Sequence, residues 1–97
     1  MKRWRLAPLA KADLDEIWSY IASQGSTAAA NRLIDKIEAH CDMLGRMPKA
    51  GRDASDLWPG ARTFPVGNYI IYYLEKPRIG VLISRIRHAA RDKEPEI

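Results

Sequence analysis

The residues of this sequence that could do chemistry are mostly basic. Six of them lie in the second half of the chain: Arg52, Arg62, Arg85, Arg87, His88 and Arg91. Guanidinium groups bind phosphate oxygens through paired hydrogen bonds, and a histidine can move a proton near neutral pH. If neighbouring strands bring Arg62 and Arg85 together, they form an anion site, and with His88 they become a candidate set for RNA cleavage.

A structural role is the alternative for the same residues. Arg85 on a sheet can pair with Asp92 or Glu75, and His88 can hydrogen-bond the backbone where its strand ends. The residues alone leave both interpretations open.

Other kinds of site have little support. His40 and His88 are far apart in the sequence, and neither has a second ligand at a spacing that metals use, so we expect no metal. No glycine pattern cradles a phosphate, no serine lies in a nucleophile elbow, and no cofactor is indicated. Asp13, Asp15 and Glu16 are spaced so that they scatter around a helix, which predicts a solvated face.

Composition predicts one soluble domain over residues 1–97. Of the 97 residues, 46% are hydrophobic and 29% charged, as in ordinary globular proteins. The single cysteine, Cys41, excludes an intramolecular disulfide and suits a core position. The longest apolar run, Tyr69–Leu74, is far short of the roughly 20 residues of a membrane helix. We therefore expect a cytoplasmic protein. Its net charge of +4 is modest, but the six basic residues between Lys76 and Lys93 suit either nucleic acid or an acidic protein partner, or form only a solvated edge.

Helical spacing of apolar residues predicts two helices. The first begins at Pro8 and places Trp18 in the core, and Gly25 ends it in the left-handed conformation. Ser26 or Thr27 caps the second. Its apolar positions are Ala30, Leu33, Ile34, Ile37, Cys41 and Leu44. So short a connection makes the two helices an antiparallel hairpin.

Strand patterns flank the hairpin. Residues 1–7 alternate between polar and apolar, 46–60 have no period and predict a loop, and 92–97 are polar and expected to fray. Three further strands are predicted, the first an edge strand and the second central: Ala61–Pro65, Tyr69–Leu74 and Ile79–His88. The fold class is therefore α+β: an N-terminal strand, an antiparallel helical hairpin, and a three-stranded antiparallel meander forming a small sheet packed against the helices.

Several segments, in order along nearly the whole chain, resemble the ParE branch of the RelE/ParE toxin superfamily. They are Leu6–Ala10, Ala12–Ile21, Ala29-Ala30, Leu33–Glu38, Pro48, Gly51-Arg52, Arg62–Tyr69, Tyr72-Tyr73, Arg85, His88 and Ala90–Asp92. The resemblance implies the fold derived above and a bacterial growth-inhibiting toxin of a type II toxin–antitoxin system. It further implies a hetero-oligomer with a cognate ParD-type antitoxin, and DNA gyrase as the target, poisoned by binding and not by catalysis.

The alternative is a RelE-like ribosome-dependent mRNA endonuclease that uses Arg62, Arg85 and His88. The acidic tail at 92–97 lacks the tyrosine often found there in such enzymes, which places this interpretation second. A DNA-binding module ranks third, because no recognition helix is evident. The candidates for contact with target or antitoxin are Tyr20, Trp58, Arg62, Tyr69, Arg85, Arg87, His88 and Arg91. Tyr20 lies off the helical apolar stripe and is expected to be exposed.

Overall fold

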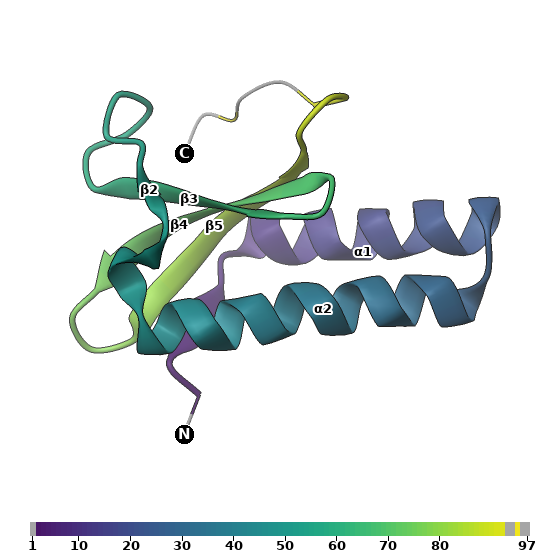
Figure 1. The fold of residues 1–97 in the computed structure, drawn as a ribbon, viewed down its shortest axis with the longest axis horizontal. Helices are drawn as coiled ribbons and strands as arrows, with labels where there is room; N and C mark the ends of the chain where they lie inside the picture. The colour runs from purple at the N-terminus through teal and green to yellow at the C-terminus, as the bar shows by residue number, and fades with distance from the viewer. Residues whose placement is uncertain (1, 93–94, 96–97) are drawn as a thin grey trace.

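The computed structural model describes residues 2–92 and 95, so most of the tail that was expected to fray lies outside the described residues. The elements follow the predicted order of strand, helical hairpin and strands (Figure 1). They are β1 (Trp4–Leu6), α1 (Pro8–Gln24), α2 (Thr27–Arg46), a 3-10 turn (Pro48–Ala50), β2 (Arg52–Asp53), β3 (Ala61–Val66), β4 (Tyr69–Lys76) and β5 (Gly80–His88). The α+β fold class is confirmed.

The sheet has five strands in the order β1-β5-β4-β3-β2, and it is mixed because β1 runs parallel to β5. The meander of β3, β4 and β5 is antiparallel, with β4 in the middle as predicted. The segment 46–60 is not simply a loop, since it contributes the two-residue strand β2, which places Arg52 opposite Thr63. The prediction that β3 is the edge strand is therefore wrong where β2 pairs with Arg62 and Thr63, and Pro65 lies beyond this paired part.

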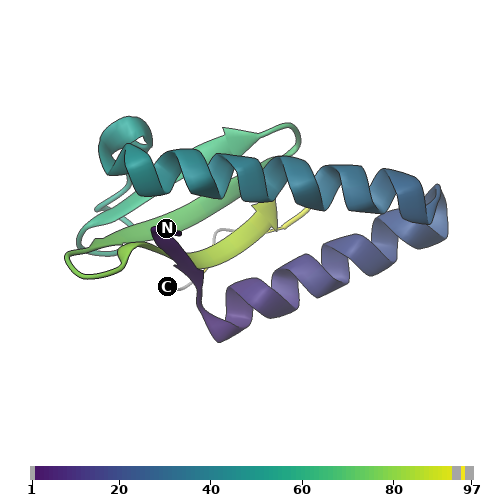
Figure 2. The same cartoon turned by 90° about the horizontal axis from the view of Figure 1, so that it is seen from below.

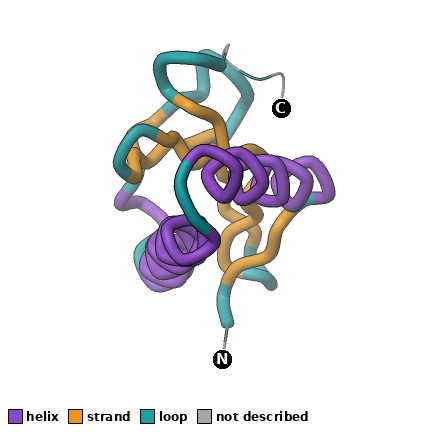
Figure 3. Tube along the Cα trace, turned by 90° about the vertical axis from the view of Figure 1, so that its right-hand side faces the viewer, coloured by secondary structure: helices purple, strands orange, loops and turns teal. Residues whose placement is uncertain are grey.

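Both helices pack on one face of the sheet and lie side by side as a hairpin (Figures 2 and 3). The apolar stripe of α2 meets the central strands, and the side chains of Ile37, Leu44, Ile71, Tyr73 and Ile83 are fully buried between them. No described helix is long and apolar enough to cross a membrane. The helical stripe and the sheet face thus make one core.

The hairpin confirms one predicted cap and corrects two expectations. Ser26 Oγ accepts a hydrogen bond from the N–H of Ala29 at 3.0 Å, as an N-cap does. Gly25 has φ −131°, so it ends α1 outside the left-handed region. The prediction that Trp18 is in the core is wrong. Its side chain is 37% exposed, and its indole N–H donates to Asn31 Oδ1 of α2 at 2.8 Å.

Tyr73 and Cys41 are among the core side chains that carry polar atoms. The Tyr73 hydroxyl donates to the carbonyl of Pro48 at 2.7 Å and accepts from the N–H of Gly51 at 2.8 Å, which fastens the turn after α2 to the central strand. Cys41 is buried as predicted, and burial raises the pKa of its thiol to about 12. The thiol is therefore protonated at neutral pH and is a poor nucleophile.

Two glycines allow the N-terminal segment to enter the fold. The Arg3 carbonyl accepts from the N–H of Val81 at 3.0 Å. A Cβ on Gly45 of α2 would come within 2.8 Å of that carbonyl oxygen, and a Cβ on Gly80 would also collide with it. Gly80 has φ +106°, a conformation that other residues adopt at a cost. The Arg3 backbone thus lies between the end of α2 and the start of β5.

Replacing Gly80 with alanine should destabilise the fold much more than the same change at Gly60. Gly60 has φ +82° with nothing within 4 Å of its Cβ position, so Gly60→Ala carries only the conformational cost, about 1–2 kcal/mol. Gly80→Ala adds the collision with Arg3, and we expect roughly 3 kcal/mol or more in the free energy of unfolding. Urea denaturation of both variants measures this, and equal losses would contradict the close contact.

Candidate functional site

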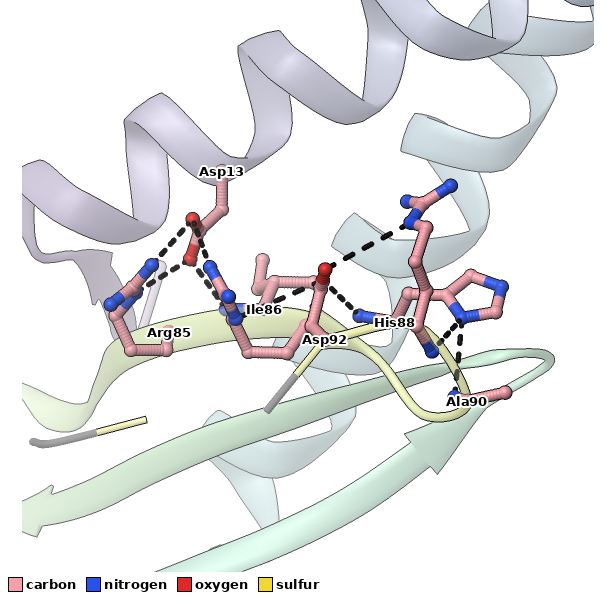
Figure 4. Close-up of polar contacts among 8 residues, drawn as sticks. Asp13, Arg85, Ile86, His88, Ala90 and Asp92 are labelled. Atoms are coloured by element: carbon pink, nitrogen blue, oxygen red, sulfur yellow. Dashed lines mark hydrogen bonds and ion pairs between the residues drawn. The ribbon is translucent and has the colours of Figure 1, made fainter. Parts of the chain in front are cut away.

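A buried carboxylate joins the first helix to the last strand. Asp13 of α1 has a residue exposure of only 6%, and its side chain points at β5 (Figure 4). Its oxygens accept hydrogen bonds from Arg85 Nε at 2.8 Å and Arg85 Nη2 at 3.0 Å, and from the backbone N–H of Ile86 at 2.9 Å. The hydrogen bonding with Asp13 raises the pKa of Arg85 above its ordinary value. The expectation that Asp13 lies on a solvated helix face is wrong.

The edge of the sheet explains why a carboxylate is needed there. Strand β1 accompanies β5 only as far as Ile83, so beyond that residue the outer N–H groups of β5 need other partners. Asp13 accepts from the N–H of Ile86, and Asp92 Oδ2 accepts from the N–H of His88 at 2.7 Å. Two carboxylates thus take the place of a neighbouring strand along this edge.

An irregularity in β5 precedes this edge. Tyr72 faces Arg85 while Tyr73 faces Ile83, so Ser84 is an extra residue in the ladder, and its hydroxyl donates to the carbonyl of Tyr72 at 2.9 Å. Such a bulge re-aims the side chains that follow it. In this chain it precedes Arg85, whose guanidinium reaches the carboxylate of Asp13.

A second arginine is held more loosely beside the first. Arg87 Nη1 is 3.6 Å from Asp13 Oδ1, and Arg87 Nε is 3.8 Å from Asp92 Oδ2. The Nε atom is buried and makes no hydrogen bond within the described part of the chain. Next to it is a hollow of about 310 Å³ between α1 and the end of β5, where the Arg91 guanidinium lies 4.6 Å from the Tyr20 ring.

His88 has a structural role at the end of β5. Its Nδ1 accepts hydrogen bonds from the N–H groups of Ala90 and Arg91, at 3.2 and 3.1 Å, which makes Nδ1 the unprotonated nitrogen of the ring (Figure 4). The ring also meets the edge of the Tyr69 ring, with centroids 5.2 Å apart. His88 therefore hydrogen-bonds the backbone at the strand end, which is one of the two roles that the sequence left open.

The predicted anion site of Arg62 and Arg85 does not form. Strand β4 separates the strands that carry these residues. Arg62 donates from Nη1 to the carbonyl of Gly51 at 2.9 Å, and Arg85 pairs with Asp13 instead of Asp92 or Glu75. Of the predicted set, the structure brings together those that lie at the end of β5: Arg85, Arg87, His88 and Arg91.

The predicted aromatic contacts divide by exposure. Tyr69 is 5% exposed, so the free chain does not offer it to a partner. Tyr20 is exposed as predicted, and so is Trp58. Trp58 borders a second hollow of about 470 Å³, which Leu9, Leu74 and Leu82 also line. Within residues 2–92 and 95, no cluster of three His, Cys, Asp or Glu residues could hold a metal ion.

Sequence reasoning missed the importance of Asp13, although one signal was available. Asp13 is three residues after Ala10 and four before Ile17, both of which are buried on the same stripe. A carboxylate at helical spacing among core residues must be paired when it is buried. The spacing therefore indicated a paired carboxylate. It could not identify Arg85 and Ile86 as the partners, because they are more than 70 residues away in the sequence.

The family of the chain follows from its sequence matches. The family model described as the ParE toxin of the type II toxin–antitoxin system, parDE, matches residues 4–93. The chain belongs to the ParE toxin family. It is 32% identical to toxin ParE1 of Caulobacter vibrioides over 87 residues, which are 90% of this chain and 86% of that protein. It is also 24% identical to toxin ParE1 of Mycobacterium tuberculosis over 90 residues, 93% of this chain and 92% of that one.

A solved structure shares the fold. A chain in the structure described as the chromosomal ParDE TA system from P. aeruginosa superposes with a TM-score of 0.76 at 21% identity. The match covers 91% of this chain and 96% of that chain. The ParE-family chain therefore has the architecture of a known ParDE component over nearly its full length.

Replacing Asp13 with asparagine should strongly destabilise the protein. The asparagine side chain of Asp13→Asn would keep a hydrogen-bond acceptor but lose the negative charge that compensates Arg85 and Arg87. We therefore expect the free energy of unfolding to fall by about 2–4 kcal/mol. Asp15→Asn is the matched control, because Asp15 is exposed on the same helix and, among the described residues, forms an ion pair only with Lys11 at 3.9 Å. It should change stability by less than about 0.5 kcal/mol. Chemical denaturation that gives equal losses would contradict the role of Asp13.

Proposed function

We propose that this ParE-family toxin stops growth by binding DNA gyrase and trapping cleaved DNA complexes, and that a ParD-type antitoxin neutralises it. One observation supports binding over catalysis: the polar groups at the end of β5 are engaged in hydrogen bonds within the protein. Asp13 engages Arg85 through two hydrogen bonds, and backbone N–H groups engage His88 Nδ1. Family membership supports the target and the antitoxin.

A ribonuclease would need those groups to be free and close together. A general base must reach the proton it removes, and cations must face the phosphate on which charge develops. His88 Nδ1 already accepts two hydrogen bonds, Arg85 is paired, and Arg62 lies across β4 from Arg85. The RelE-like alternative would require these residues to rearrange before any cleavage.

The surface of the chain suits protein partners. Tyr20 and Trp58, 46% and 48% exposed, each border a hollow, and aromatic side chains next to arginines are the commonest anchors of protein interfaces. Tyr20 projects from the helical hairpin beside Arg91, so we assign the antitoxin contact to this part of the surface.

Purified gyrase tests the target directly. Toxin added to gyrase, ATP and supercoiled plasmid should raise the fraction of linear plasmid recovered after detergent and protease treatment, because a poison holds the cleaved intermediate. Induction in cells should also trigger the DNA-damage response. If neither linear plasmid nor the damage response appears, the gyrase assignment is wrong.

A single variant separates this function from ribonuclease activity. His88→Gln keeps an acceptor for the backbone N–H groups but removes the imidazole. A ribonuclease that uses His88 would lose roughly 10²–10⁴-fold in cleavage rate, as measured by primer extension on translated messages. Under the proposal, the variant still traps gyrase complexes and wild type makes no such cuts. Message cuts that disappear in the variant would favour the RelE-like enzyme.

The antitoxin contact makes its own prediction. Tyr20→Ala should weaken the affinity for the cognate ParD-type antitoxin by tenfold or more, about 1.4 kcal/mol, because it removes an exposed anchor ring beside the hollow. Ser19→Ala, at the neighbouring exposed position of α1, is the matched control and should leave the affinity unchanged. Calorimetric titration measures both, and equal affinities for the two variants would place the contact elsewhere.

A further inference from the structure

A basic end is formed where the first strand begins, α2 ends and the β4–β5 turn closes (Figures 1 and 2). The Arg3 backbone lies between Gly45 of α2 and Gly80 of β5, which brings these three segments into contact. The cations that they carry, named here the basic end, are Lys2, Arg3, Arg5, Arg46, Lys49, Lys76 and Arg78.

The charge of the basic end is largely uncompensated. Among the described residues, two carboxylates hydrogen-bond or ion-pair with these segments: Asp42 accepts a hydrogen bond from the Trp4 indole, and Glu75 lies 3.9 Å from Lys49 Nζ. Seven cations against these two carboxylates leave an excess of five, which is larger than the net charge of +4 of the whole chain. The rest of the protein is therefore close to neutral.

Most cations of the basic end are also unpaired. Five of them are exposed and make no ion pair within residues 2–92 and 95: Arg3, Arg5, Arg46, Lys76 and Arg78. This differs from the end of β5, where Arg85, Arg87 and Arg91 all have carboxylate partners. Exposed cations without partners can replace the counterions of an anionic polymer at no cost in broken ion pairs.

We propose that the basic end binds the phosphate backbone of duplex DNA. Exposed arginines and lysines from three segments suit a repeated phosphate, because guanidinium and ammonium groups contact its oxygens without reading sequence. A protein partner would be expected to use aromatic anchors. Of the seven cations only Lys76 lines a hollow together with an exposed ring, that of Trp58, and neither Trp18 nor Tyr20 lines that hollow. The charge alone therefore favours DNA over an acidic protein.

This inference deepens the proposed function and rests on it for the source of the DNA. Gyrase acts on DNA, so a toxin bound to gyrase has a duplex within reach, and phosphate contacts would help to hold the cleaved complex. The basic end shares no residue with the lining of the hollow beside Tyr20. Substitutions in the basic end therefore leave the residues of that hollow unchanged.

Fluorescence anisotropy with a short labelled duplex tests the DNA contact without gyrase. The whole toxin should bind weakly and without sequence preference, and log K should fall with log salt with a slope of about −4 to −5 if five phosphates are contacted. Lys76→Glu/Arg78→Glu should weaken binding at least tenfold and reduce the slope by about 2. Arg32→Glu/Lys36→Glu is the control, since it makes the same charge change at two exposed residues of α2 that lie outside the basic end and form no ion pair with any described residue.

Three outcomes would overturn the proposal. The first is the absence of salt-dependent DNA binding, and the second is an equal loss in the two variants, which would show a general charge effect. The third is displacement of the duplex by polyglutamate as efficiently as by unlabelled DNA at equal charge, which would indicate an acidic protein as the partner. Correct folding of both variants is checked by their denaturation midpoints.

The gyrase assay then separates this inference from the proposed function. The Lys76→Glu/Arg78→Glu variant should still be retained on immobilised gyrase without DNA, while the yield of cleaved plasmid falls at least fivefold relative to wild type and to the control. An unchanged yield of cleaved plasmid would contradict the role of the basic end but would leave the proposed gyrase function standing. If the wild type is not retained on gyrase, the proposed function fails while the anisotropy result still decides DNA binding.

Discussion

The carboxylate of Asp13 makes the contacts on which the candidate site at the end of β5 depends. One side chain compensates the charge of Arg85, satisfies the outward N–H of Ile86 and helps to hold Arg87. It also fixes α1 against β5 at the place where β1 has ended. The hollow beside Tyr20 has its shape because these contacts hold its two walls together.

A buried ion pair is an expensive way to attach a helix to a sheet. An apolar residue at position 13 could pack as well, and such replacements are often neutral or stabilising elsewhere. Here, however, it would leave the N–H of Ile86 without an acceptor at a buried edge, and it would leave Arg85 uncompensated. The edge of β5 therefore requires an acceptor, and a carboxylate also provides the charge that two arginines need.

The elements with strong periodicity were predictable, and the long-range pairings were not. The stripe from Ala30 to Leu44 and the apolar run at Tyr69–Leu74 identified α2 and the central strand, because local spacing carries that information. Strand β2 has only two residues and no period of its own, since it exists through pairing with β3. Trp18 follows the helical spacing of the core, yet the pairing of α1 with α2 leaves its indole on the surface.

The candidate site shows the same division. The residue types at the end of β5 were visible in the sequence, but their roles depend on partners from α1 and from the turn after the strand. The sequence left a structural and a chemical role open for both Arg85 and His88. Asp13 gives Arg85 the structural role, and the N–H groups of Ala90 and Arg91 do so for His88. The cations that form no ion pair with a described residue, such as Arg5 and Arg78, belong to segments that are far apart in the sequence and that the fold brings together.

The central claim is that the toxin acts by binding gyrase and not by cutting RNA. Selection of cells that survive induction of an intact toxin gene tests this claim most directly. The mutations that allow these cells to survive identify the target on which the toxin acts. We predict that resistance mutations map to the genes for the gyrase subunits, and that the altered gyrase no longer yields linear plasmid with the toxin. Resistance mutations confined to ribosomal components would contradict the claim.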